Sequence, residues 1–291
     1  MQKKHLFIPL LFLWNFLLGC GDTLLEDLIL SEDINKKFDL PAEINESSGI
    51  IIYDSLIWTF NDSGRDNILY GLDLQDGSIK KRIYINTENK DWEDIAQDTI
   101  NIYLGDIGNN LGNRTDLRIY IIPKDSIKNL PEQHITAEEI NYYYGEQLDF
   151  TEQLEANAFD CESMFSLGDS LYLFTKNWTE DLTSLYQLPK EPGNYRARQI
   201  ASFGSDGLIT GADFNPDSHE LVICGYKQYV PYIIYFENAD QLNLNDIPKV
   251  RVDFFDRFGL QIEGVTIDNQ VMYLSAEDSF EPQALFSYQP E

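Results

Sequence analysis

The amino-acid sequence predicts an all-β fold, and three observations support this prediction. Short runs rich in β-branched and aromatic residues follow one another from Phe38 onward, for example GIIIYDSLIWTF at 49–60 and INIYL at 100–104. Turns that contain Asn, Asp, Gly or Pro separate these runs. Clear helical periodicity is scarce over the same part of the chain.

The strand-like runs recur in a fixed order that divides the chain into five units. The units begin with SSGIIIYD (47–54), WEDIAQD (92–98), CESMFSLGD (161–169), TGADFNPDS (210–218) and IEGVTIDN (262–269). Four strands in a unit of roughly 45–70 residues are typical of β-propeller blades. The fifth unit lacks a fourth strand, and INKKFDLP at 34–41 lies before the first unit. We therefore predict a five-bladed β-propeller closed by this N-terminal strand, because closure leaves no sheet edge exposed. A six-bladed ring is the alternative, because the second unit carries an insertion around residues 124–157.

The N-terminus reads MQKKHLFIPLLFLWNFLLGCGD, with Lys3 and Lys4 before an apolar run from Leu6 to Leu18. A run this short with these flanks is typical of a signal peptide. The sequence LLGC resembles the lipobox of bacterial lipoproteins, which implies lipidation of Cys20 and an acyl anchor in the membrane. We expect a signal peptide at 1–19, a lipidated cysteine and tether at 20–36, and a propeller domain at 37–291. A plain secretory signal is the alternative. Either way the domain is expected outside the cytoplasm, and in the lipoprotein case in the cell envelope.

The formal charge is −28, from 49 acidic and 21 basic residues. This balance argues against a nucleic-acid partner, because neutralising phosphates requires clustered Lys and Arg. It permits the binding of cations, although most of the charge is expected on a solvated surface. The two remaining cysteines, Cys161 and Cys224, can form a disulfide outside the cytoplasm, but two small buried side chains are the simpler interpretation.

Equivalent positions in the five first strands carry oxygen-bearing side chains. These are Ser48, Glu93, Glu162, Thr210 and Glu263. In a propeller the first strands line the central channel, so the five side chains are expected to converge on its axis. Three neighbouring carboxylates cannot all stay ionised without a cation. Oxygen ligands without His or Cys favour Ca²⁺ before Mg²⁺. Hydrated carboxylates without a metal are the alternative.

At these positions the sequence resembles the calcium-activated, apyrase-type nucleotidases, which are five-bladed propellers. The resembling blocks include ESSGIIIYDSLIWTFNDSG, DWEDIAQDTINIYLGDIG and IEGV, and they cover residues 46–280 motif by motif. The resemblance implies one axial Ca²⁺ held by the five positions above, with Thr210 in place of a serine. It also implies hydrolysis of phosphoanhydrides. The family's basic residues are poorly matched, and the same blocks resemble uncharacterised secreted bacterial propellers.

The ends of the second strands are expected to cluster at one end of the ring, where loops commonly bind ligands. Hydrolysis there requires a base, for which Asp62 and Asp106 are candidates. It also requires a cation on the developing charge, for which the candidates are Lys176, Arg65 and Lys227. The sequence leaves open whether the protein is an enzyme. A non-catalytic propeller that binds a glycan or a protein is the main alternative, and a glycosidase with paired carboxylates is a third.

Overall fold

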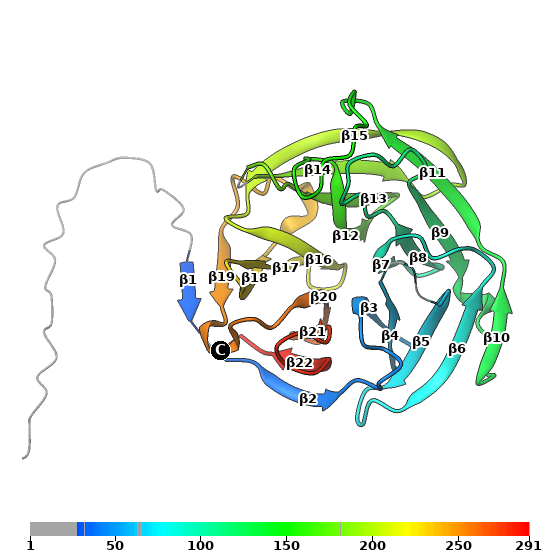
Figure 1. Cartoon of the computed structure of the whole chain (residues 1–291). Coiled ribbons are helices and arrows are strands. Elements are labelled where there is room, and N and C mark those ends of the chain that lie inside the picture. Colours follow the sequence, from blue (N-terminus) through cyan, green and yellow to red (C-terminus); the bar gives the residue numbers. More distant parts are fainter. Residues whose placement is uncertain (1–27, 32, 63, 65, 181, 291) are drawn as a thin grey trace, which may run out of the picture.

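The computed structural model describes residues 28–290 except 32, 63, 65 and 181. Within this part the chain forms strands and three short 3₁₀ segments at Lys124–Ser126, Ala239–Gln241 and Phe255–Arg257, without an α-helix. The predicted all-β class is therefore confirmed for the described residues. No helix in that part is long and apolar enough to cross a bilayer. Figure 1 shows the sheets arranged around a central axis, a β-propeller-like architecture.

Antiparallel strands follow one another in the order that the repeated units predict. The first unit contains β3 (Ser47–Tyr53), β4 (Leu56–Asn61), β5 (Ile68–Asp73) and β6 (Ile79–Ile85). The second contains β7 (Trp92–Gln97), β8 (Asn101–Asp106), β9 (Arg118–Pro123) and β11 (Glu138–Tyr144). The third contains β12 (Asp160–Leu167), β13 (Ser170–Lys176), β14 (Leu182–Pro189) and β15 (Gly193–Gly204). The fourth contains β16 (Leu208–Asn215), β17 (Glu220–Lys227), β18 (Val230–Phe236) and β19 (Lys249–Asp253). The last contains β20 (Ile262–Asp268), β21 (Val271–Ala276) and β22 (Ala284–Tyr288).

The N-terminal strand β2 (Asn35–Asp39) pairs antiparallel with β22, the last strand of the chain. This is the closing pair that the sequence predicts. A second strand, β1 (Leu28–Ser31), pairs parallel with β19, so part of the segment expected to be a tether is a strand. The insertion in the second unit forms β10 (Glu132–Ile135), which pairs parallel with β6 at the edge of the first unit. The insertion therefore extends an existing sheet and does not build one of its own.

The first strand of each unit lies innermost, and each contacts the next around a ring of β3, β7, β12, β16 and β20. Five buried apolar clusters lie between neighbouring units. In the cluster between the first two units, Trp58 and Trp92 are both fully buried. Truncating a side chain of this size to Ala typically costs about 3–5 kcal/mol. Packing between units and the parallel pairing of β11 with β15, which joins the second and third units in one sheet, therefore hold the ring together.

Strand β7 explains how a glutamate lies beside a buried tryptophan. Trp92 packs into the cluster between units, whereas Glu93 lines a cavity at the start of the inner strands. The next residue, Asp94, is fully buried and accepts hydrogen bonds from the N–H groups of Met164 on β12 and Ala212 on β16. A Cβ atom added to Gly49 on β3 would lie 2.4 Å from the Asp94 carboxylate, so a larger side chain does not fit there. Asp94 thus connects β7 to β12 and β16 at the residue that follows Glu93.

Candidate cation-binding site

Each inner strand has a β-bulge at the position that the repeat alignment predicts as a ligand. The pairing register shifts between Ser47 and Ile50, Trp92 and Asp94, Cys161 and Ser163, Ile209 and Gly211, and Ile262 and Gly264. The residues within these shifts are Ser48 with Gly49, Glu93, Glu162, Thr210 and Glu263. A bulge leaves a residue unpaired and redirects its side chain. The five positions are therefore equivalent in backbone geometry as well as in sequence.

Four of the five residues line one cavity of about 340 Å³, which we call the acidic cavity. These are Ser48, Glu93, Glu162 and Glu263. The ends of second strands add Asp62, Lys176, Tyr226 and Glu277 to the same lining, as the expected clustering of strand ends requires. Among the described lining residues, Lys176 is the one cation, whereas six side chains are carboxylates. The cavity therefore carries a strong excess of negative charge.

The buried carboxyl groups of the acidic cavity are held toward their neutral forms. Burial raises the pKa of Glu93 well above its usual range, and the charges of Asp62 and Glu162 raise it further. Burial also raises the pKa of Glu263 to about 7 and that of Glu277 to about 8. A cation among these groups would favour their ionised forms. The donor set consists of oxygen atoms, which suits a hard divalent ion.

Lys176 places its ammonium group inside this carboxylate cluster. It forms an ion pair with Glu162, and each of the two side chains is only 7% exposed. The ammonium nitrogen also lies 4.8 Å from the ring centre of Trp178 and 5.4 Å from that of Tyr226. Cation–π contacts of this kind add to the attraction when the cation is desolvated. The lysine predicted as a catalytic cation is thus engaged with a predicted metal ligand.

The two hydroxyl groups of the predicted set donate hydrogen bonds to the neighbouring inner strand. Ser48 Oγ donates to the carbonyl of Glu93, and Thr210 Oγ1 donates to the carbonyl of Ile262 at 2.7 Å. A hydroxyl that donates its proton keeps lone pairs with which it can bind a cation. Ser48 lines the acidic cavity, whereas Thr210 lies outside its lining. The structure therefore brings Ser48, but not Thr210, to the cavity surface.

The tightest carboxylate group differs from the predicted one. Among the described residues, ligand atoms of Asp62, Asp91 and Glu93 lie within 4.8 Å of one another. Burial raises the pKa of Asp91 to about 7, and the nearby charge of Asp62 contributes to this shift. Glu162 is not in this group and pairs with Lys176 instead. Asp91 was not identified as a ligand from the sequence, because it precedes the inner strand at a position that the repeat does not distinguish.

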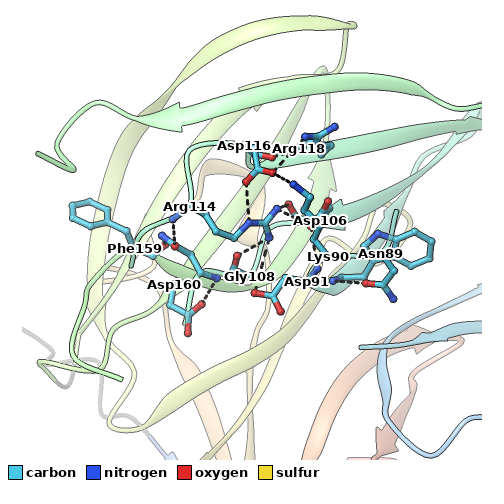
Figure 2. Close-up of polar contacts among 12 residues, drawn as sticks. Asn89, Lys90, Asp91, Asp106, Gly108, Arg114, Asp116, Arg118, Phe159 and Asp160 are labelled. Carbon is cyan, nitrogen blue, oxygen red and sulfur yellow. Dashed lines mark hydrogen bonds and ion pairs between the residues drawn. The ribbon is translucent and has the colours of Figure 1, made fainter. Parts of the chain in front are cut away.

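Asp106 lies in a different environment from Asp62, although both end second strands. It is 1% exposed and accepts a hydrogen bond from Arg114 Nη2 at 2.8 Å. Figure 2 shows that Arg114 also contacts the carbonyl of Gly108 and the carboxylate of Asp116. Asp106 does not line the acidic cavity. Its contacts are those of a residue that fixes the β8–β9 loop, and they do not place it as a base beside a ligand.

The other two predicted cations do not line the acidic cavity. Lys227 forms an ion pair with Asp206 and lines a neighbouring pocket of about 750 Å³. The two pockets share Glu155, Trp178 and Tyr226. Arg65 lies outside the described residues, as does Cys20.

Cys161 and Cys224 are both buried and free, so the alternative of a disulfide between them is not found.

No family model matches this chain. No curated protein matches it either. Solved structures that match include a computationally designed protein named Ika8, with 7% identity and a TM-score of 0.35 over 84% of this chain and 72% of that one. A hydrazine synthase of Kuenenia stuttgartiensis matches with 10% identity and a TM-score of 0.36 over 85% of this chain and 57% of that one. A nidogen/laminin complex matches with 14% identity and a TM-score of 0.44 over 88% of this chain and 92% of that one.

Proposed function

We propose that this chain is a lipid-anchored, five-bladed β-propeller of the cell envelope with a divalent cation on its axis. The cation is Ca²⁺ rather than Mg²⁺, and a small polar ligand binds beside it. The observation that carries the proposal is the set of equivalent bulges on the inner strands, of which Glu93, Glu162 and Glu263 line one cavity. A repeated bulge that presents an oxygen ligand from successive strands suits an ion on their common axis.

The blade number is supported by the closed ring of contacts among β3, β7, β12, β16 and β20. It is also supported by the pairing of β2 with β22, which completes a fourth strand in the last unit. The six-bladed alternative rested on the insertion in the second unit. Because a strand of this insertion pairs with β6, the insertion does not support a sixth blade.

The residues that would hold the cation are Glu93, Glu162 and Glu263 of the bulges, together with Asp62 and Asp91, whose ligand atoms lie close to that of Glu93. A bound Ca²⁺ would neutralise these carboxylates and offer an open coordination position to an oxygen of the ligand. The side chains of Trp178 and Tyr226 would contact the same ligand from the wall shared with the neighbouring pocket. Burying carboxylates without a counter-charge costs free energy, and a bound cation would supply that counter-charge.

Binding without turnover is favoured over hydrolysis. Phosphoanhydride chemistry needs a cation free to meet developing negative charge, and Lys176 is paired with Glu162. Hydrolysis remains the second candidate, because Asp62 and Lys176 line the same cavity and can serve as base and cation. The glycan-binding version is supported by aromatic side chains near the cavity, including Tyr229, which is 63% exposed. Such rings stack on sugar faces and offer a polar end to the solvent.

The anchor rests on the LLGC motif that ends at Cys20. The test is fractionation of cells that express the parent protein or Cys20→Ala. We expect the parent protein in the membrane fraction and the variant in the soluble fraction or unprocessed. An equal distribution of the two would contradict the lipid anchor.

The cation is tested by thermal unfolding of the purified protein in EDTA and after addition of Ca²⁺ or Mg²⁺. We expect Ca²⁺ to raise the unfolding midpoint by several degrees, because a ligand at one hundred times its Kd adds about 2.7 kcal/mol of stability. The double variant Glu93→Gln/Glu162→Gln should lose this shift, and the exposed control Glu132→Gln should keep it. The absence of a Ca²⁺ shift in the parent protein would contradict the proposed ion. Phosphate release from nucleoside diphosphates, measured with Ca²⁺ present, then separates hydrolysis from binding.

A further inference from the structure

A second cavity of about 460 Å³ lies at the opposite ends of the inner strands. We call it the opposite cavity, and its lining includes Ile52, Gln97, Leu167, Asn215 and Asp268 from the ends of the five inner strands. None of these residues lines the acidic cavity. Along β7, the buried carboxylate of Asp94 lies between Glu93 in one cavity and Gln97 in the other. The two cavities can therefore be tested independently.

One wall of the opposite cavity presents an ammonium group, that of Lys124, which is half-buried and not in an ion pair with any described residue. Its nitrogen donates to Gln97 Oε1 at 2.8 Å and to the backbone carbonyl of Asp98, which are both neutral acceptors. It also lies 4.5 Å from the ring centre of Tyr53. An ammonium group has three N–H donors, so one is left over. Burial lowers the pKa of Lys124, and the nearby charge of Asp98, which is itself paired with Lys190, offsets this shift in part.

The lining of the same cavity also contains a carboxylate without a counter-ion among the described residues, that of Asp213 on β16. Its Oδ2 atom accepts hydrogen bonds from Thr266 Oγ1 at 2.7 Å and from the N–H of Ile267 at 3.1 Å. No described residue forms an ion pair with it. Burial raises its pKa to about 6. Asp217 and Asp268 also line the cavity and add negative charge to it.

The second lysine of the cavity does not supply the missing counter-ion. Lys190 pairs with the carboxylate of Asp98 at 3.0 Å and donates to the carbonyl of Gly168. That pair is neutral as a unit. The cavity is thus left with an unpaired cation at Lys124 and an unpaired anion at Asp213, although a direct pair between them would have offset both charges. Leaving half-buried charges without partners is costly unless something else compensates them.

We propose that the opposite cavity binds a small zwitterion, an amino acid or a short peptide, with its carboxylate on Lys124 and its ammonium group on Asp213. Apolar side chains that include Leu167, Phe214 and Ile267 line the cavity and would contact the carbon chain between the two charged ends. The volume lies in the range of small-molecule sites in proteins. This inference does not depend on the proposed Ca²⁺ site, because no residue is shared between the two linings.

The test is calorimetric titration of the purified protein, in EDTA, with ω-amino acids from glycine to 6-aminohexanoate. Hexanoate and hexylamine each carry one of the two charged ends and are the ligand controls. At least one ω-amino acid should bind about tenfold or more tightly than either control, since each end then contributes its own interaction. The chain length that binds best reports the distance between the charged groups of Lys124 and Asp213.

Lys124→Met should weaken zwitterion binding about tenfold or more and leave the binding of hexylamine unchanged. Asp213→Asn, which keeps an oxygen acceptor for Thr266 and Ile267, should also weaken zwitterion binding about tenfold or more and leave the binding of hexanoate unchanged. Lys80→Met, an exposed lysine outside the cavity, is the matched control and should change neither. Binding of hexylamine as tight as that of every ω-amino acid would overturn the proposal, as would absence of binding across the series. If Asp213→Asn does not fold, the comparison of ligands and Lys124→Met still decides.

Discussion

Lys176 pairs with Glu162 inside the acidic cavity, where both side chains are almost wholly buried. In this arrangement an internal ammonium group compensates part of the carboxylate cluster. A divalent cation placed among the same carboxylates would meet the positive charge of Lys176. The lysine and the proposed ion are therefore expected to compete.

Replacing Lys176 by Met tests this competition. In EDTA the variant should lose about 3–5 kcal/mol of unfolding free energy, because Glu162 is left as an unpaired buried carboxylate. Its affinity for Ca²⁺ should rise, since the competing charge is gone. Urea unfolding and calcium titration measure the two effects. Lys80→Met, which removes a partly exposed ion pair, should change stability by about 1 kcal/mol or less. A Lys176→Met protein with weaker Ca²⁺ binding would contradict the competition.

The two aspartates that end β4 and β8 should give opposite results. Asp106→Asn should lower stability by about 1.5–3 kcal/mol, because Arg114 loses a charge-assisted hydrogen bond but keeps Asp116, and should change Ca²⁺ affinity less than Asp62→Asn does, since Asp106 does not line the acidic cavity. Asp62→Asn should weaken Ca²⁺ binding, because Asp62 belongs to the tight group with Asp91 and Glu93. Unfolding curves and calcium titrations of both variants check this. An Asp106→Asn protein of parent stability with impaired Ca²⁺ binding would reverse the assignment.

Stability in EDTA should depend on pH through Glu277. Burial, with the charges of Glu263 and Asp62, raises the pKa of Glu277 to about 8, far above the value of about 4.3 in an unfolded chain. Between these values the folded state binds more protons, so this group's contribution is fully present below about pH 4 and is lost as the pH rises toward 8. Urea midpoints from pH 4 to 8 should therefore fall more steeply for the parent than for Glu277→Gln. Equal slopes would show that Glu277 is not buried in its neutral form.

The closing strand β2 should be required for a soluble monomer. Deleting residues 1–41 removes the partner of β22 and leaves its backbone N–H and C=O groups at an open edge. We expect this variant to aggregate, whereas deletion of residues 1–32, which retains β2, should give a monomer. Size-exclusion chromatography distinguishes the two results. Two equally monomeric proteins would show that β2 is dispensable for closure.

Much of the fold follows from local patterns in the chain. Alternating and β-branched runs specify the strands, and the repeated order of runs places Glu93, Glu162 and Glu263 at equivalent positions. The unpartnered segment before the first unit also identifies β2 as the strand that pairs with β22. The insertion in the second unit could not be assigned in this way. Its strand β10 pairs with β6, which lies about one unit earlier in the sequence. Nothing in the four residues of β10 indicates that β6 is the partner.

Side-chain environments were decided by the tertiary structure. Asp62 and Asp106 occupy corresponding strand ends, yet only Asp106 has Arg114 folded back over it from the following loop. Lys176 resembles a free basic residue in the sequence, and only the bulge at Glu162 in the paired strands β12 and β13 brings the two side chains together.

The sequence by itself determined the strands, their order and the equivalent oxygen-bearing positions, because these depend on residue type and spacing along the chain. The tertiary structure decided which charges compensate one another. Lys124, in the 3₁₀ segment after β9, and Asp213, on β16, line a common cavity although they are distant in the sequence, and neither residue is distinctive there. Electrostatic interactions depend on separation in space and on burial, and a linear pattern contains neither quantity.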